Sequence, residues 1–445
     1  MRVARSSLQI RCCLAVIVAL TNPWSRAKAQ SLNDAGTWAL RASLSLQGDD
    51  ERQNAVRAKL RGAYEAFLPR VTWEHDLILG GKIDYLPDYS SITNSYYGGI
   101  DTMARRDPNV YGLQLSFPIL DGLKRFNDLQ AAKSALREGV YLNIDKRQQV
   151  LLDTANAYLA VLRDRKTVAL RRELVNDLTA ISKRVGVQYA VRDATRADFA
   201  LAESRVQAGL VALEGARAAL SASEIELQRL TQANIASLER PLIPSGALPD
   251  TADALRQATL AQSPKIRAAQ LGAEAAEYLA KTAYAPLLPQ LNLIASRTDQ
   301  TNLSQIQNRI RDTSVRLQLL IPIYEPGAFS GVSAAKALAT RKRFESLDLE
   351  RQLVAANQAL FQARRATTAQ IAQARQRASE IKRVVDGYKV ERDAGLRTVI
   401  DVLNVQAEWT EARVAQVNLE YERDRLTYTL AATLGRLDTG ERPPP

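Results

Sequence analysis

The spacing of apolar positions changes twice along each half of the chain, at matching places. From about residue 31 to 64, leucines recur among charged and small residues at helical spacing, and Leu68-Pro69 ends the pattern. A counterpart runs from about residue 250 to 284 and ends at Leu288-Pro289. Proline lacks the amide that a helix needs and biases the preceding residue towards extended backbone. We therefore expect each half to begin with a helix that stops at a Leu-Pro pair.

After each Leu-Pro pair the apolar residues alternate, which is the pattern of a strand with one apolar face. Two outgoing and two returning runs carry it: Val71, Trp73, His75, Leu77 and Leu79; Tyr111, Leu113, Leu115 and Phe117; Leu291, Leu293 and Ala295; Val315, Leu317, Leu319 and Ile321. About ten residues with one apolar face suit a tilted strand that crosses a bilayer. We expect the return strands to end at Pro118 and Pro322, and polar segments near 82–109 and 298–313 to join the pairs.

The longest periodic stretches follow these strands. Helical patterns run from about residue 123 to 189 and from 329 to 395. At 1.5 Å per residue, each makes a rod about 100 Å long, which has to lie against other rods.

Two further helices are predicted to begin at Thr195 and Thr398 and to pair with these rods. Steps that alternate between 3 and 4 select a mostly apolar or small seam in each: Phe199, Ala202, Val206, Gly209, Leu213, Ala216, Leu220, Ser223, Leu227 and Leu230; then Val402, Val405, Trp409, Ala412, Gln416, Leu419, Arg423, Leu426, Leu430 and Thr433. A heptad held over four repeats predicts coiled-coil packing.

The two halves are copies of one unit. The offset of 398 − 195 = 203 also places Ala131-Ala132-Lys133 on Ala334-Ala335-Lys336. We divide the chain into a first repeat (30–231), a connector with three prolines (232–249), a second repeat (250–435) and a flexible tail (436–445), all preceded by residues 1–29.

Residues 1–29 have the features of a secretory signal peptide. They contain a basic start, a short apolar run from Leu14 to Leu20 and the cleavage motif Ala27-Lys28-Ala29. Both cysteines, Cys12 and Cys13, lie inside this segment. The formal net charge of +12 falls to 12 − 5 = +7 without its five basic groups. The remaining basic residues are scattered among acidic ones along helices, so nucleic acid is not an expected partner.

The residue inventory argues against catalysis. The chain has one histidine and no glycine-rich phosphate loop, and no Asp, Glu and His cluster has metal-ligand spacing. We therefore predict that the protein is not an enzyme and needs no cofactor or metal.

Four strands cannot close a membrane barrel within one chain, because the smallest such barrels have about eight. An open sheet edge in lipid leaves backbone groups unpaired, at several kcal/mol each. If the strands enter a membrane, several copies must share one barrel. Three copies supply twelve strands, but a dimer or a tetramer satisfies the same requirement.

In this order, these features resemble the TolC-type outer membrane factor family. The resemblance rests on the signal peptide, the duplicated helix–strand–strand–helix unit, the prolines at strand ends and the segment from Gly395 to Asn404, GLRTVIDVLN. It implies a mainly α fold with a small β part: long helical hairpins form a trimeric α-barrel, joined to a 12-stranded outer membrane β-barrel with four strands per chain. It also implies a passive exit duct in the outer membrane of a Gram-negative cell, with a long periplasmic extension. The duct works with a periplasmic adaptor and an inner-membrane transporter, in efflux or type I secretion. The alternative is a periplasmic coiled-coil structural or adaptor protein.

The same resemblance assigns a gate at the hairpin tips. Asp401 falls at an acidic ring that faces the lumen, and Arg397 and Asp198 fall where the inner helix pair is held to the outer one. Asn404 stands at the place of a second acidic residue, and Arg392 at the place of an aromatic one.

The residues assigned to the adaptor contact at the tips are Arg192, Asp193, Gly395 and Leu396. A structural alternative stays open for Asp198 and Asp401, because Thr-x-x-Asp is also a capping-box-like start of a helix.

Overall fold

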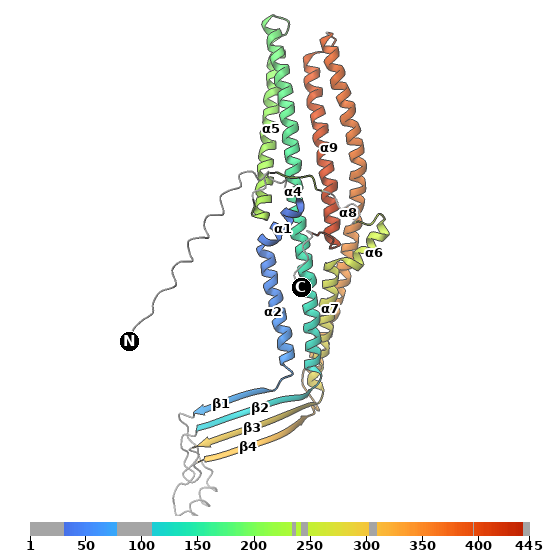
Figure 1. Ribbon diagram of the computed structural model, residues 1–445. Helices are drawn as coiled ribbons and strands as arrows, with labels where there is room; N and C mark the ends of the chain where they lie inside the picture. Colours follow the sequence, from blue (N-terminus) through green and yellow to red (C-terminus); the bar gives the residue numbers. More distant parts are fainter. Residues whose placement is uncertain are drawn as a thin grey trace, which may run out of the picture.

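The computed structural model describes residues 31–77, 109–233, 237–241, 248–301, 309–394 and 396–438. The predicted signal peptide lies outside these residues. The described helices form an elongated bundle, and one four-stranded sheet extends to the side at one end of it (Figure 1). None of the helices in these ranges is both long enough and apolar enough to span a membrane.

The four longest helices form two hairpins at the end opposite the sheet. The first hairpin is α4 (Lys124–Ala190) with α5 (Arg196–Thr231), and the second is α8 (Ala328–Asp393) with α9 (Val399–Thr433). Both pairs begin and end within two residues of the predicted bounds. Along α5, all ten predicted seam residues are buried or half-buried, which confirms the heptad.

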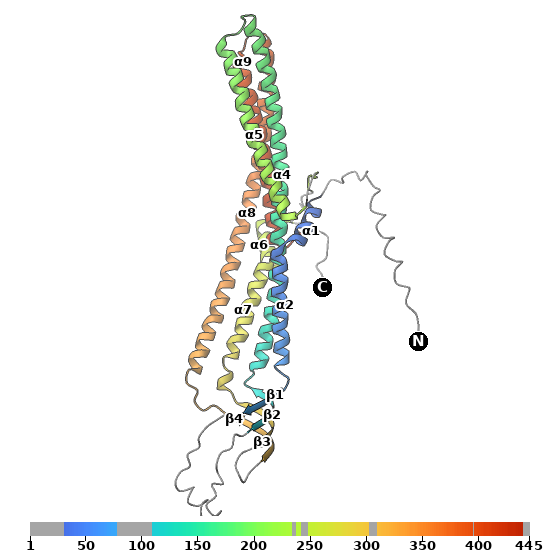
Figure 2. The same ribbon diagram turned by 90° about the vertical axis from the view of Figure 1, so that its left-hand side faces the viewer.

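The helix predicted at the start of each half is broken once. The first is split into α1 (Leu32–Ala42) and α2 (Leu44–Glu65), and the second into α6 (Ala252–Gln262) and α7 (Pro264–Thr282). The prediction of single helices was therefore wrong. In the second copy Pro264 explains the break, because its ring prevents Ser263 from continuing α6. Figure 2 shows α2 and α7 beside the sheet-proximal halves of α4 and α8, while α1 and α6 lie near mid-height.

The sheet contains β1 (Arg70–Leu77), β2 (Asn109–Asp121), β3 (Gln290–Thr301) and β4 (Arg309–Leu320), in that order and all antiparallel. The four predicted strands are confirmed. Their bounds differ in two places.

The strand β2 continues past Pro118 to Asp121, with a register shift between Pro118 and Leu120 that absorbs the missing amide. Residues 298–301 and 309–313, expected as parts of a polar connection, belong to β3 and β4. Their charged side chains pair across the sheet, Asp299 with Arg309 and Arg311.

The junction between sheet and helices is tightly packed in the first copy. Gly122 has a φ of +64°, and a Cβ placed on it would lie 2.7 Å from the carbonyl oxygen of Ala285, in the short 3-10 turn η2 (Ala285–Leu287) of the second copy. Next to it, Arg125 donates to the Asp121 carboxylate at 2.8 Å and lies over the Phe67 ring. This junction therefore holds elements of both copies together at the foot of the bundle.

We predict that Gly122→Ala destabilises this junction by about 2–3 kcal/mol, because a side chain here meets both a left-handed backbone and a close carbonyl. Gly62→Ala is the matched control, since its added Cβ has open space in the last turn of α2. Urea unfolding followed by circular dichroism measures both. Equal midpoints for the two variants would contradict the packing argument.

Candidate channel gate at the helical tips

The first hairpin turns through a left-handed residue. Arg192 has a φ of 63°, its amide donates to Tyr189 at 3.1 Å, and the amide of Asp193 donates to the carbonyl of Gln188 at 2.8 Å. A non-glycine residue costs about 1 kcal/mol or more in this conformation. The matching position of the second copy is Gly395, which lies outside the described residues. There the amide of Leu396 donates to the carbonyl of Glu391 at 2.8 Å, the same pattern of closure.

Both returning helices start with a capping box, as the Thr-x-x-Asp spacing suggests. The Asp401 amide donates to the Thr398 hydroxyl at 3.2 Å, and the Asp401 carboxylate accepts from the Thr398 amide and hydroxyl. Thr195 and Asp198 repeat these contacts. Hydrogen bonds from Thr398, aided by the positive charge of Arg397, hold the pKa of Asp401 below its usual range. The alternative that both Asp residues cap the start of a helix is thus confirmed. The lowered pKa keeps Asp401 charged at neutral pH.

Four of the five predicted gate residues lie on the second tip, and Asp198 lies on the first. Arg397 donates to Glu391 at 2.8 Å, and its guanidinium lies 4.3 Å from the centre of the Tyr388 ring. This ion pair and ring contact lie within the second hairpin, so the role of Arg397 and Asp198 in holding the two hairpins together stays a prediction.

The remaining predicted residues differ in exposure. Arg392 is half-buried near the end of α8, and Asn404 is exposed one turn into α9. Leu396 is 76% exposed at the turn itself, and Arg192 and Asp193 are exposed on the other tip. The structure therefore places Arg192, Asp193 and Leu396, three of the residues assigned to the adaptor contact, at the far end of the rods, where a partner can reach them.

An apolar cluster directly below the tips joins the two hairpins. Leu178, Ile181 and Val185 of α4 pack with Ala202 of α5 and with Val402 and Leu403 of α9. The rings of Tyr189 and Phe199 stack above it with centroids 5.8 Å apart. The position of each tip is consequently coupled to the other through α4.

Sequence reasoning missed the second buried stripe of α9. Besides the predicted seam, α9 buries a row that contacts or faces α4: Leu403, Gln406, Thr410, Val414, Val417, Asp424 and Tyr428. Successive members of this row are 3, 4 or 7 residues apart, so its helical periodicity was available in the sequence. Its many polar members concealed it.

The α4–α9 seam is held by polar pairs between the two helices. Gln406 donates to the Asp177 carboxylate, and Arg413 donates to Glu173 at 2.8 Å. Arg171 reaches Glu411 with a second contact of 3.0 Å. These pairs lie between the two hairpins, so any movement of one hairpin against the other has to change them.

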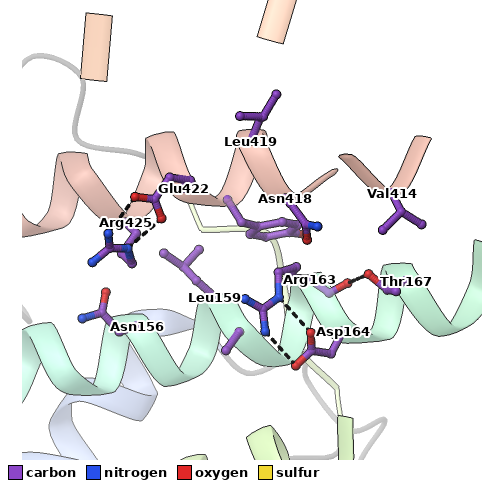
Figure 3. A pocket seen from close by; sticks show the side chains of 12 residues that line it. Asn156, Leu159, Arg163, Asp164, Thr167, Val414, Asn418, Leu419, Glu422 and Arg425 are labelled. Carbon is purple, nitrogen blue, oxygen red and sulfur yellow. Dashed lines mark hydrogen bonds and ion pairs between the residues drawn. The ribbon is translucent and has the colours of Figure 1, made fainter. Parts of the chain in front are cut away.

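A groove of about 620 Å³ lies along this seam nearer mid-height (Figure 3). The charges that line it are paired with each other. Arg163 binds Asp164 through two contacts, of 2.8 and 3.2 Å, and Arg425 binds Glu422 through two more, of 2.8 and 2.6 Å. Because these ions already have partners, the groove is better explained as helix packing than as a ligand site.

No group of three or more His, Cys, Asp or Glu side chains within the described ranges is placed to hold a metal ion. The geometry instead defines an elongated protein with two helical hairpins at one end and a sheet with one apolar face at the other. An adaptor would have one hairpin flanked by β-rich segments, so the alternative reading loses support.

Comparison with known proteins supports the resemblance to the outer membrane factors. Residues 255–436 match the outer membrane efflux protein family. The chain is 28% identical over 370 residues to the outer membrane efflux protein BepC of Brucella suis biovar 1 (strain 1330), across 80% of this chain and 78% of that protein.

Solved structures show the same fold over almost the whole chain. The CmeC outer membrane channel of Campylobacter jejuni matches with a TM-score of 0.78 and 17% identity, over 92% of this chain and 87% of that one. The outer membrane protein VceC of Vibrio cholerae matches with a TM-score of 0.76 and 19% identity, over 91% and 96%. These comparisons agree with the resemblance to the TolC-type family: the family match covers the second repeat, and the fold of the described chain is that of these channels. The matched proteins are named as outer membrane efflux proteins and channels and not as enzymes, which agrees with the localisation and class expected from the sequence.

We predict that Thr398→Ala weakens the cap of α9 by about 1 kcal/mol, whereas Thr398→Ser retains it. Amide hydrogen exchange of residues 396–405 should be about fivefold faster in the alanine variant at neutral pH.

The pH dependence provides a second check. Because the pKa of Asp401 is lower in the folded protein, its carboxylate stabilises the start of α9 at every pH above the pKa of the unfolded chain, near 3.8. This stabilisation is lost as the pH falls through the lower pKa of the folded state. The difference between Thr398→Ala and the wild type should therefore shrink in acid. Equal exchange of the two proteins at neutral pH would exclude the cap.

Proposed function

We propose that three copies of this chain assemble side by side in a closed ring and form one duct. The hairpin tips close the periplasmic entrance of this duct. The observation that supports this proposal is that two opposite sides of the chain each carry an edge strand and exposed apolar helix residues. Within the described residues, the edge strands β1 and β4 each have a neighbour on one side only.

The outer helices carry large exposed apolar residues on the same two sides. Val211 of α5 is 74% exposed and Ile225 is 64% exposed, while Phe344 and Val390 of α8 are 65% and 71% exposed. A heterologous contact between the α5 side of one copy and the α8 side of the next satisfies both sides when the rotation closes a ring. The repeat boundaries given above, 30–231 and 250–435, are proposed as the two structural units of each protomer.

In this duct Asp401 faces the lumen near the entrance, and three symmetry-related carboxylates attract cations there. Arg397 and Asp198 restrain the tips in the closed state, with Asn404 and Arg392 beside them. A periplasmic adaptor binds at Arg192, Asp193, Gly395 and Leu396 and separates the tips. Substrates delivered by an inner-membrane transporter then leave passively. The names of the relatives, efflux proteins, favour efflux over secretion of polypeptides.

The sheet supplies a further candidate feature that sequence reasoning missed. Glu74, Asp76 and Asp312 lie on the face opposite the apolar one, around Gly112 and Thr298. If the apolar face contacts lipid, these carboxylates line the exit end of the same duct and favour cations there as well.

We predict that Asp401→Ala, alone or with Arg397→Ala, raises the ion conductance of the purified protein in planar bilayers severalfold and reduces its cation preference. Glu380→Ala is the matched control, since it also removes an exposed acidic partner of an arginine, but on the body of α8. If conductance and cation preference match those of the wild type, the gate assignment is wrong and the fold is unaffected.

Adaptor contact is tested by crosslinking from single introduced cysteines. The background is low because both cysteines of the chain, Cys12 and Cys13, lie in the predicted signal peptide. A cysteine introduced by Asp193→Cys should crosslink to a periplasmic adaptor in whole cells. A cysteine introduced by Ser221→Cys, exposed on the body of α5, should not. Equal crosslinking from both positions would contradict a contact confined to the tips.

A further inference from the structure

The strand register sorts the side chains of the sheet into two faces, since directly paired residues point to the same side. One face, here called the outer face, has apolar rows at the end near the helices. Its rows there are Leu291 with Leu319; Phe117 with Leu293 and Leu317; Val71 with Leu115, Ala295 and Val315. Apolar rows of this kind suit contact with lipid chains.

Towards the other end of the strands, the same face becomes aromatic and then basic. Trp73 and Leu113 share a row with Arg297, and the stacked rings of His75 and Tyr111 share the next row with Asp299 and Arg311. Arg309 lies in the row after that, opposite Thr301. We call Arg297, Arg309 and Arg311 the basic rim.

The basic rim carries excess positive charge. Its three guanidinium groups have one carboxylate on this face of the described strands, that of Asp299. Both Arg309 and Arg311 bind it, the latter at 3.1 Å. Their side chains remain 56% and 50% exposed, whereas that of Asp299 is 19% exposed. Asp299 therefore fixes the orientation of two arginines while leaving most of their surface accessible to a further anion.

The basic rim lies at the depth of lipid headgroups. Eight residues separate Leu319 from Arg311, which corresponds to about 27 Å along a strand at 3.4 Å per residue. A strand tilt of about 40° reduces this to about 21 Å of bilayer thickness, close to the height of the apolar band of outer membrane barrels. When the apolar rows lie among acyl chains, the basic rim therefore meets the headgroups at the end of the sheet far from the helices.

The opposite face does not share this charge. At the corresponding level it carries Glu74, Asp76 and Asp312, and its own arginines, Arg70 and Arg316, lie nearer the helices. The positive charge far from the helices is thus specific to the face that bears the apolar rows.

We propose that the basic rim binds the phosphate groups of an anionic lipid in the outer leaflet of the membrane. Guanidinium groups suit phosphate because they donate two parallel hydrogen bonds in a fixed plane. The aromatic side chains of Trp73 and Tyr111 lie where the chain region meets the headgroups, as aromatic residues of membrane proteins do. The proposal rests on the insertion of the sheet in the outer membrane.

The test uses the full-length protein, purified in a neutral detergent, with diphosphoryl lipid A as the probe and phosphatidylcholine as the neutral comparison. Binding is measured by native mass spectrometry and by titration at two salt concentrations. The wild type should bind lipid A in preference to phosphatidylcholine, and added salt should weaken this preference. Membrane fractionation is run in parallel, so that failed insertion, which would contradict the proposed function, is distinguished from failed lipid binding.

Three variants make the test specific. Arg309→Gln with Arg311→Gln should weaken lipid A binding roughly 25-fold, since each such charge near an anionic lipid surface contributes about a fivefold factor. Arg316→Gln, on the same strand but the opposite face, should bind as the wild type does. Asp299→Asn should bind lipid A several-fold more tightly, because it frees two guanidinium groups, and a folding defect cannot produce that gain.

The proposal is overturned if the double variant binds lipid A as well as the wild type, or if Arg316→Gln loses as much binding. It is also overturned if inorganic phosphate binds as tightly as lipid A, because the rim would then be a general anion site and not a lipid contact.

Discussion

The length of α4 is the constraint on which the rest of the structure depends. A helix of 67 residues is about 100 Å long and cannot bury its apolar positions by folding back on itself. It is covered instead along its whole length by shorter elements: α2 and α7 near the sheet, α1 at mid-height, and α5 and α9 towards the tips. Since these partners come from both copies of the repeat, α4 makes the two copies one unit. The copies cannot behave as separate domains.

The same packing makes the position of the tips depend on contacts below them, and so bears on the proposed gate. The apolar cluster around Leu178 and Val185 and the polar pairs from Asp177 to Gln406 and from Glu173 to Arg413 lie along one seam. Apolar contacts tolerate a small sliding of helices, whereas a polar pair with a fixed geometry is either made or broken. The seam therefore favours discrete positions of the second hairpin over a continuous range, which is what a gate requires.

The sheet combines three environments on two faces. Its outer face is apolar near the helices and basic at the far end, while its other face is polar with an acidic row. Antiparallel pairing maintains this separation, because a slip of one residue would exchange the faces of an entire strand. The bulge at Pro118 shifts the register of β2 by one residue, so that pairing with β3 continues past a residue that cannot donate to the ladder.

Much of the architecture was determined by the sequence alone. The periods of the apolar residues defined the four strands and the four long helices, and Thr-x-x-Asp marked both helix starts, because these features depend on residues close in sequence. The strand formed by residues 309–313 and the α4 face of α9 were decided by the tertiary structure. In each case polar residues were stabilised by partners distant in sequence, as Asp299 is by Arg309 and Arg311, and Asp177 by Gln406. A local pattern marks such residues as exposed, and only the fold brings them to the groups that satisfy them.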